Sequence, residues 1–290
     1  MSGFPPPPGP QQALLPDGEL CAPHPPIDAP RYYFDLYNNL DLAEPYRGDW
    51  NDEERMLRDG HSYHAQSSPS DPEYIRQLRV GYYGAITHMD HQIGRIISAL
   101  VEQKLMDNTV ILFVADHGEM LGDHLMFQKA KPYQGSVQVP MFLSGPERLI
   151  GKHRRVCGDL VELRDVMPTL LDLAGAEIPQ TVDGESMLHT IDRKYIHGEH
   201  SLGMDSMHFI VTKTDKYVWY SQTGRELYFH LETDPHESHN AIDDAEYAQR
   251  IAHLRQRLIQ ELDGREEGYS DGTQLIIGRP PQTVLKNTSC

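Results

Sequence analysis

Cysteine is scarce in this sequence of 290 residues, and long apolar runs are absent. The three cysteines, Cys21, Cys157 and Cys290, are too few and too odd in number for a disulfide framework. The longest apolar run, 110–115, is far shorter than the ~18 residues that a membrane-spanning helix needs. The N-terminus lacks a basic start followed by an apolar stretch, so no secretory signal is visible. The sequence as given therefore points to the cytoplasm, and nothing else in it specifies a location.

Basic side chains are also in the minority. Lys and Arg number 26 against 43 Asp and Glu, which gives a formal net charge of −17. Such a negative surface argues against partners that are bound through their own negative charge, so neither nucleic acid nor a membrane is expected. Hydrophobic residues make up 39% of the chain, enough for a sizeable core. The 16 histidines, several of them beside carboxylates, are the part of the composition that points toward chemistry.

Three regions differ in pattern. Residues 1–20 are rich in proline, glycine and glutamine, which predicts a disordered tail. Residues 21–190 alternate helical patterns with apolar strand patterns, which predicts an α/β core. Residues 191–290 carry several short strand patterns and one helical pattern, which predicts a small antiparallel sheet with a helix on it.

The core region begins with a long amphipathic helix. Asp-Pro-Glu at 71–73 suits a helix start, and apolar residues then recur at three- and four-residue steps to about residue 105. Two continuously apolar segments follow, 109–115 and 139–143, and such segments are typical of strands buried on both faces. A further helix is expected over 165–174.

The C-terminal region predicts a run of hairpins. The strand candidates are Tyr195–His197, His208–Lys213, Lys216–Tyr220 and Glu226–Leu231. Thr214-Asp215 and Thr223-Gly224 between them are typical of turns. An apolar stripe then predicts a last helix over 245–262.

The strongest chemical signal follows the first apolar strand. Asp116 and His117 come at its end, where ligand sites of open α/β sheets lie. A carboxylate beside an imidazole offers two metal ligands, although the pair also suits an Asp that caps the next turn beside an exposed His. Lys129, twelve residues after His117, would offer fixed positive charge to an anion unless it is a solvated loop lysine. Lys131 and the amides of 135–136 could join it.

The run that contains these residues resembles a known segment. It reads ADHGEMLGDHLMFQKAKPYQGSVQVPMFLSGP and is similar to the C-terminal metal-and-lysine segment of the sulfatase family, within the alkaline-phosphatase-like superfamily. Other stretches resemble the family in the same order: APHPPIDAPRYYFDLY its histidine loop, GYYGAITHMDHQIGRIISAL its long helix, YIHGEHS and KYVWYSQTGRELYFHLETDPHES its C-terminal subdomain, and GRPPQTVL the tail of some bacterial members. The resemblance implies an incomplete alkaline-phosphatase-like core sheet with flanking helices over 21–190, followed by the C-terminal sheet and helix.

The resemblance also implies an activity and a site. Members hydrolyse sulfate esters with a divalent cation, commonly calcium, and Mn²⁺ or Zn²⁺ are the alternatives here. Asp116 and His117 match the family's cation ligands. Lys129 matches the lysine that contacts the sulfate and its bridging oxygen, and His24 matches the histidine near the leaving group. The expected partner is a small-molecule or saccharide sulfate ester, and oligomer formation is left open.

The sequence departs from the family at the nucleophile. The family makes a formylglycine within a C-x-P-x-R motif, and this sequence contains no such motif. Cys21 matches its first position, but Pro25 stands where arginine belongs. Only 23 residues precede His24, whereas the family carries its first strand and its nucleophile there. We therefore expect a chain truncated on its N-terminal side, weakly active or inactive by itself.

Two other functions stay open. His117 replaces the asparagine of many sulfatases, and imidazole favours zinc, manganese or iron over calcium, which suits phosphate or phosphonate esters as substrates. A non-catalytic subunit that completes a partner's sheet would also account for the missing half.

Several neighbouring polar residues have simpler interpretations. His-Gly-Glu-His at 197–200 lacks the spacing of H-E-x-x-H, so a pocket wall or a hydrogen-bonded network is expected there. Glu119, Asp123 and His124 are expected to make loop hydrogen bonds, and His124 is also a candidate for lining the substrate pocket.

Overall fold

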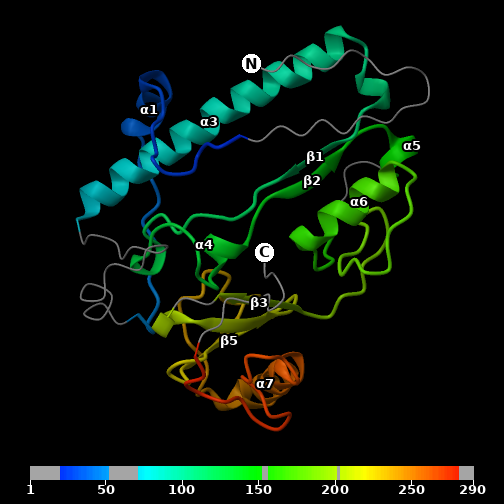
Figure 1. The fold of residues 1–290 in the computed structure, drawn as a ribbon. Helices are drawn as coiled ribbons and strands as arrows, with labels where there is room; N and C mark the ends of the chain where they lie inside the picture. The colour runs from blue at the N-terminus through cyan, green and yellow to red at the C-terminus, as the bar shows by residue number, and fades with distance from the viewer. Residues whose placement is uncertain (1–19, 52–70, 152–155, 201–202, 281–290) are drawn as a thin grey trace.

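The computed structural model describes residues 20–51, 71–151, 156–200 and 203–280. The tail predicted over 1–20 therefore lies outside the described residues except for its last position. Figure 1 shows the described chain as a stack of layers, with the long helix α3 at the top, a pair of strands below it, a second sheet further down and α7 at the bottom. The mixed α/β fold predicted from the sequence is confirmed.

Helices and strands alternate in the first part of the chain and separate in the second. The helices are α1 (Arg31–Asn38), α3 (Pro72–Glu102), α4 (Gln134–Val137), α5 (Glu147–Ile150), α6 (Val166–Leu173) and α7 (Ala248–Leu262). The strands are β1 (Ile111–Val114), β2 (Met141–Ser144), β3 (Ile196–His200), β4 (Met207–Val211), β5 (Asp215–Tyr220) and β6 (Glu226–His230).

Helix α3 begins as the sequence predicts. The Asp71 side chain accepts a hydrogen bond from the Glu73 amide at 3.0 Å, which caps the helix. Near the middle of the helix a Cβ atom on Gly84 would lie 3.0 Å from the backbone of Tyr33. A glycine is therefore needed for α1 to pack this closely, and α1 is the second half of the stretch that resembles the histidine loop.

The pair β1–β2 forms the core sheet. The two strands are antiparallel, with Phe113 opposite Phe142 and their ring centroids 5.0 Å apart. The prediction that both strands are buried on both faces is wrong for the described chain. All of β1 is only partly buried, β2 alternates, and Phe142 is 53% exposed. Burial on both faces requires flanking strands and helices, and among the described residues β1 pairs only with β2.

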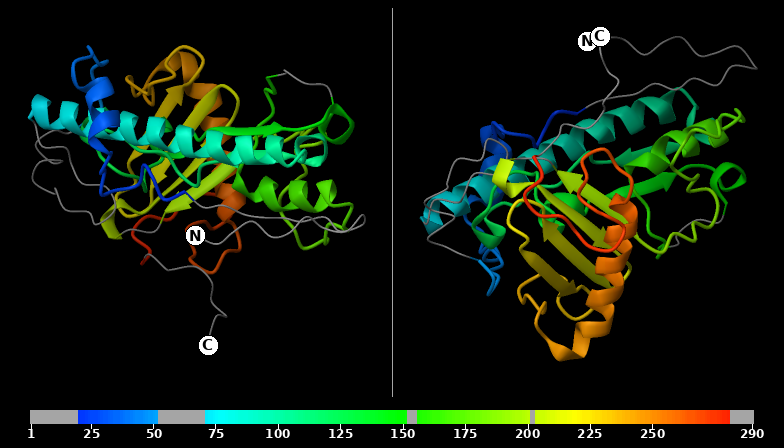
Figure 2. Two further views of the ribbon diagram at one scale, coloured as in Figure 1. Left: turned by 90° about the horizontal axis from the view of Figure 1, so that it is seen from above. Right: turned by 60° about the horizontal axis from the view of Figure 1, so that its bottom comes forward.

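The second sheet is a four-stranded antiparallel meander in the order β3-β4-β5-β6. Every residue of β5 is buried, because both faces of this sheet are covered. Helix α7 packs across one face, where Tyr217, Trp219 and Leu258 belong to one apolar cluster. The other face meets Trp50, Met120 and their neighbours from the core region. Figure 2 shows α7 lying along the sheet.

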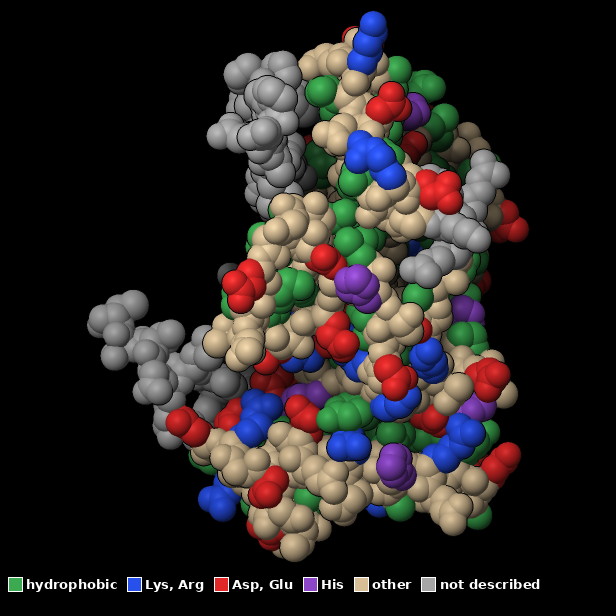
Figure 3. Space-filling view, turned by 90° about the vertical axis from the view of Figure 1, so that its right-hand side faces the viewer, with side chains coloured by type: hydrophobic (Ala, Val, Ile, Leu, Met, Phe, Trp, Pro, Cys, Tyr) green, Lys and Arg blue, Asp and Glu red, His purple; other side chains and the backbone are tan. Residues whose placement is uncertain are grey.

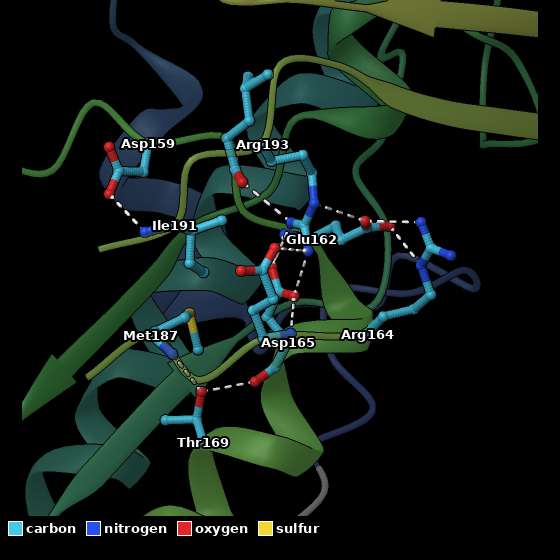
Figure 4. A network of polar contacts seen from close by, with 10 residues as sticks. Asp159, Glu162, Arg164, Asp165, Thr169, Met187, Ile191 and Arg193 are labelled. Atoms are coloured by element: carbon cyan, nitrogen blue, oxygen red, sulfur yellow. Dashed lines mark hydrogen bonds and ion pairs between the residues drawn. The ribbon is translucent and has the colours of Figure 1, made fainter. Parts of the chain in front are cut away.

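A polar network ties α6 to the chain that leads into the second sheet. The Arg193 guanidinium donates to both carboxylate oxygens of Asp165, at 2.7 and 2.8 Å, and Asp165 also accepts from the amides of Glu162 and Glu185 (Figure 4). Burial by itself would raise the pKa of Asp165, but these hydrogen bonds outweigh it and hold the pKa below its usual value. The network fixes how the two sheets are joined.

The surface differs between the two regions. In Figure 3, charged side chains of both signs cover the lower part of the face shown, and hydrophobic side chains lie between fewer charges in the upper part. No helix within the described ranges has the length and apolar character required to cross a membrane.

Candidate active site at the end of β1

A tight turn follows β1 and sets the position of the predicted site. The Gly118 amide donates to the Ser136 carbonyl at 2.8 Å. A Cβ atom at Gly118 would lie 2.2 Å from the Gly135 carbonyl oxygen, so only glycine allows this close approach. The turn packs against α4 and brings Asp116 and His117 out at the end of the strand.

Asp116 and His117 face each other across this turn. His117 Nε2 lies 3.6 Å from Asp116 Oδ2, and the Asp116 side chain is 85% exposed. His117 Nδ1 lies 2.8 Å from the Gly118 carbonyl oxygen. A carbonyl only accepts, so in the neutral ring Nδ1 carries the proton and Nε2 keeps its lone pair. The pair thus presents a carboxylate oxygen and an imidazole nitrogen to the same space.

Lys129 and His24 meet beside this pair. Lys129 Nζ lies 2.6 Å from His24 Nε2, although the two residues are 105 positions apart in the chain. His24 Nδ1 lies 2.7 Å from the Pro25 carbonyl oxygen, so by the same reasoning Nδ1 is the donor and Nε2 accepts from the lysine. The His24 ring stands edge-on to the ring of His117, with 5.9 Å between the centroids. Asp116, His117, His24 and Lys129 therefore form one continuous series of contacts.

A half-buried carboxylate, Glu119, braces the loop that carries Lys129. Glu119 accepts hydrogen bonds from the amides of Gln128 and Leu121, which joins the two ends of the loop around Lys129. Burial raises the pKa of Glu119, and the hydrogen bonds and the nearby charges of His117 and Lys129 oppose that rise. The predicted loop hydrogen bonds of Glu119 are confirmed.

The loop between β1 and β2 holds an unusual backbone. Five of its non-glycine residues have positive φ: Leu121, His124, Leu125, Gln128 and Ala130. Each such residue costs on the order of 1 kcal/mol, so the surrounding structure must hold the loop in place.

Arg79 of α3 is one of the residues that hold it. Its Nη2 donates to Asp123 Oδ1 at 2.7 Å and its Nε donates to the Leu121 carbonyl at 2.9 Å. The predicted loop hydrogen bonds of Asp123 are thus confirmed. Arg79 itself was not predicted. The sequence did hold a sign that Arg79 is buried. It lies four residues after Ile75 and so shares the apolar face of α3.

A buried ion pair from the second sheet holds the other end of the loop. Lys216 and Glu237 are 0% and 1% exposed and form an ion pair. Lys216 Nζ also donates to the Pro132 carbonyl, and Glu237 Oε2 accepts from the Gln134 amide, both at 2.7 Å. Burial lowers the pKa of Lys216, and Glu237 opposes that shift. The C-terminal sheet therefore fixes the segment that follows Lys129.

Lys131 and Ser136 make contacts away from Lys129. Lys131 Nζ lies 3.4 Å from Asp205 Oδ2, and the Ser136 amide donates to the Tyr133 carbonyl. That Lys131 and the amides of 135–136 join Lys129 in holding an anion stays a prediction.

The predicted loop hydrogen bonds of His124 are confirmed. Its amide donates to the Tyr46 carbonyl, and its carbonyl accepts from the Asn51 side chain. Its ring is 3% exposed and packs 4.9 Å from Trp50, so the alternative that it lines the substrate pocket is wrong.

The donor set at Asp116 and His117 fits a divalent cation. The carbonyl of Gly118 fixes the ring so that Nε2 is free to bind, as backbone carbonyls do for histidines that ligate metals. One carboxylate and one imidazole make a partial shell, and further ligands are needed for any of the expected ions.

Comparison with known proteins finds matches over most of the chain. The family model for sulfatases matches residues 20–176, and the model for the C-terminal part of N-sulphoglucosamine sulphohydrolase matches residues 122–263. An arylsulfatase from Clostridium perfringens is 48% identical over a match of 269 residues that covers 90% of this chain and 56% of the relative. The multifunctional alkaline phosphatase superfamily protein PehA from Trinickia caryophylli is 30% identical and covers 82% of this chain and 53% of its own length.

Among solved structures, the phosphonate monoester hydrolase from Silicibacter pomeroyi superposes with a TM-score of 0.71 at 28% identity. The match covers 83% of this chain and 54% of that one. The chain thus spans little more than half the length of the relatives that it matches.

Proposed function

Because the chain belongs to the sulfatase family, we propose that it serves the hydrolysis of sulfuric esters and that the reaction takes place at the end of β1. The substrate class is a small-molecule or saccharide sulfate ester. In this proposal Asp116 and His117 hold a divalent cation, and Lys129 and His24 act on the ester.

One observation carries the proposal. Lys129 Nζ and His24 Nε2 lie 2.6 Å apart, and the His24 ring stands against His117. Four groups thus meet in one place: the ammonium of Lys129, the imidazoles of His24 and His117, and the carboxylate of Asp116. This is the set of groups that binding a sulfate and releasing an alcohol requires.

Lys129 would act on the sulfate. The loop that Glu119 holds directs the ammonium toward His24. An incoming sulfate oxygen can therefore replace His24 Nε2 as the acceptor of the hydrogen bond from Lys129. The charge that grows on the SO₃ group during S–O cleavage is then next to a fixed positive charge. A lysine held in this way stabilises the transition state more than the ground state.

His24 would act on the leaving alcohol. Its Nδ1 proton is held by the Pro25 carbonyl and its Nε2 accepts from Lys129, so to act as an acid the exposed ring must first take up a second proton from solvent at Nε2. Nε2 is the atom that faces Lys129, and hence the place where the ester oxygen would lie once Lys129 has turned to the sulfate. Protonation there prevents the alcohol from leaving as a bare alkoxide.

The cation would supply Lewis-acid charge to the sulfate oxygens when it is bound. Calcium is the first candidate by family resemblance, and the imidazole of His117 also suits Mn²⁺ or Zn²⁺. The nucleophile is expected outside this sequence, because no C-x-P-x-R motif is present in it. The chain alone should therefore show little turnover.

The test is an assay of p-nitrophenyl sulfate hydrolysis with Ca²⁺ or Mn²⁺, by the purified chain and by the chain co-expressed with the N-terminal part of an arylsulfatase. We expect turnover only from the second preparation. Within it, Lys129→Ala should lower kcat by about 10²–10³-fold. His24→Gln should lower it by about 10²–10⁴-fold.

The matched control is Lys194→Ala, which removes an exposed lysine paired with neighbouring Asp192 and should leave kcat unchanged. Ordinary turnover by the chain alone would contradict our assignment of the nucleophile to another segment. Turnover that survives Lys129→Ala would contradict the role of Lys129.

A second candidate is the hydrolysis of phosphate or phosphonate monoesters. His117 and the similarity to the phosphonate monoester hydrolase of Silicibacter pomeroyi favour it. The same complemented preparation can be assayed with p-nitrophenyl phenylphosphonate, and its metal content measured. Higher kcat/KM for the phosphonate together with bound manganese, iron or zinc would support this candidate, whereas bound calcium and preference for the sulfate would exclude it.

A further inference from the structure

A second group of metal-binding side chains lies on the far face of the C-terminal sheet. Glu199 of β3 stands directly opposite His208 of β4, and His197 stands opposite Ile210. Directly opposed residues share a face, and Ile210 belongs to the cluster that packs against α7. His197, Glu199 and His208 therefore lie on the α7 side of the sheet, with the sheet between them and the loop of Lys129.

The donor atoms of this group form a compact triangle. His197 Nε2 lies 3.4 Å from His208 Nδ1, His208 Nδ1 lies 3.3 Å from Glu199 Oε2, and Glu199 Oε2 lies 3.8 Å from His197 Nε2. Zinc bonds of about 2.0–2.1 Å in a tetrahedron place neighbouring donor atoms about 3.3 Å apart. The spacing is thus close to that of three ligands of one ion.

The imidazole rings are held in place before an ion binds. The rings of His197 and His208 stack at an interplanar angle of 5°, with 5.6 Å between their centroids. The His208 ring is 3% exposed and packs against Tyr269 at 5.0 Å, which restricts its orientation.

Further carboxylates surround this group. Arg265 lies 2.8 Å from Glu199 and 2.7 Å from Glu267, and Glu261 of α7 lies 3.9 Å from His197 Nδ1. A divalent cation would add positive charge among these carboxylates, and Glu261 would orient His197 from its other nitrogen as outer carboxylates do.

We propose that His197, Glu199 and His208 bind a transition metal of the zinc class that links β3 and β4 beneath the C-terminal end of α7. The set of two imidazoles and one carboxylate suits Zn²⁺ rather than Ca²⁺. The ion would replace the proton on His208 Nδ1, which lies within reach of both Glu199 Oε2 and His197 Nε2, and that proton would pass to solvent. This site is separate from Asp116 and His117, and it does not depend on the proposed hydrolysis.

The test is a titration of the metal-stripped full chain with Zn²⁺, followed by calorimetry, and with Co²⁺, followed by the visible absorption of four-coordinate cobalt. Glu199→Gln and His197→Gln should each weaken Zn²⁺ binding by more than the ~10–100-fold that outer-shell changes cost. Arg265→Met, an outer-shell change, should alter the affinity by only ~10–100-fold. Near-ultraviolet circular dichroism checks that each variant folds.

Two controls separate this site from others. Asp116→Asn removes a ligand of the proposed catalytic cation and should retain this Zn²⁺ site. His239→Gln removes an exposed histidine that lies between Asp49 and Asp244 and should also retain it. Zn²⁺ binding that is absent in the wild type, or unchanged in both Glu199→Gln and His197→Gln, would overturn the proposal. Loss of binding in Asp116→Asn alone would assign the zinc to the catalytic site and overturn it as well.

Discussion

The two sheets of the molecule differ in how completely they are buried. All six residues of β5 are buried, and the apolar clusters on the two faces of its sheet contain Tyr217 and Phe229, each 0% exposed. In the core sheet no residue of β1 or β2 is fully buried, and Phe142 is half exposed. Both faces of the C-terminal sheet are covered, whereas the core sheet leaves apolar side chains such as Phe142 exposed. The contact series of Asp116, His117, His24 and Lys129, the candidate site, lies at the end of the less buried sheet and is held in place by contacts from the more buried one.

The largest expected effect comes from truncating matched phenylalanines in the two sheets. Phe229→Ala should lower the free energy of unfolding by about 3–5 kcal/mol, because it leaves a cavity in a closed core. Phe142→Ala should cost at most ~1 kcal/mol, because its ring is already half in solvent. Urea denaturation of both variants measures the difference. Equal costs would contradict the contrast between the sheets.

The next effect concerns the ion pair that joins the regions. Glu237→Gln leaves Lys216 buried without its counter-charge and should cost about 3–5 kcal/mol of unfolding free energy. Replacing both partners, Lys216→Met with Glu237→Leu, should recover part of that loss. In the complemented enzyme, Glu237→Gln should also lower kcat, because Glu237 holds the segment that follows Lys129. A double variant that is less stable than the single one would contradict this account.

A smaller effect is expected from pH. Burial lowers the pKa of His124 from 6.5 to about 4, so the unfolded chain binds a proton between these values that the folded chain does not. The free energy of unfolding is therefore unaffected by His124 above about pH 6.5. As pH falls toward 4 it decreases, by on the order of 3 kcal/mol, because the folded chain must keep the ring neutral. Urea denaturation at several pH values measures it, and His124→Phe should flatten the dependence.

His239 provides the opposite case for comparison. The hydrogen bonds that His239 donates to the carboxylates of Asp49 and Asp244 raise its pKa, so its contribution to stability is present below pH 6.5 and is lost as pH rises through the raised pKa. The side chain is 56% exposed, so the effect should be slight. A stability that rises on acidification from pH 6.5 to 4 would contradict the assignment for His124.

The smallest effect on stability is expected at the exposed apolar side chains of the core region. Val101 of α3 is 58% exposed and Met167 of α6 is 48% exposed. Val101→Lys and Met167→Lys should change the free energy of unfolding by no more than ~0.5 kcal/mol. They should nevertheless lower the binding of a hydrophobic dye by the folded chain. Absence of dye binding by the wild type would remove the reason to expect a covering partner.

The sequence predicts local structure well where one short pattern decides it. The Asp71 cap, the strand that ends before Asp116 and the hairpins of the C-terminal sheet all rest on residues close in the chain. The resemblance predicted the family, which the comparisons show. It also named the four residues of the candidate site, and whether they bind and react remains a prediction.

The contacts that hold the site were beyond the sequence because they join distant segments. Arg79 meets Asp123 across 44 positions, and Lys216 meets the Pro132 carbonyl across 84. A pattern read along the chain gives no sign of such pairings. For the same reason the sequence did not indicate that His124 is buried or that β1 is only half covered.

The series from Asp116 to Lys129 can be tested most directly by ¹⁵N NMR of the histidine rings in the full chain. We predict that His24 and His117 are both Nδ1–H tautomers, that Ca²⁺ or Zn²⁺ shifts the Nε2 signal of His117, and that sulfate added afterwards shifts Nε2 of His24. Asp116→Asn should weaken the first shift. Signals of His24 and His117 that stay unchanged through both additions would contradict a cation-and-sulfate site at the end of β1.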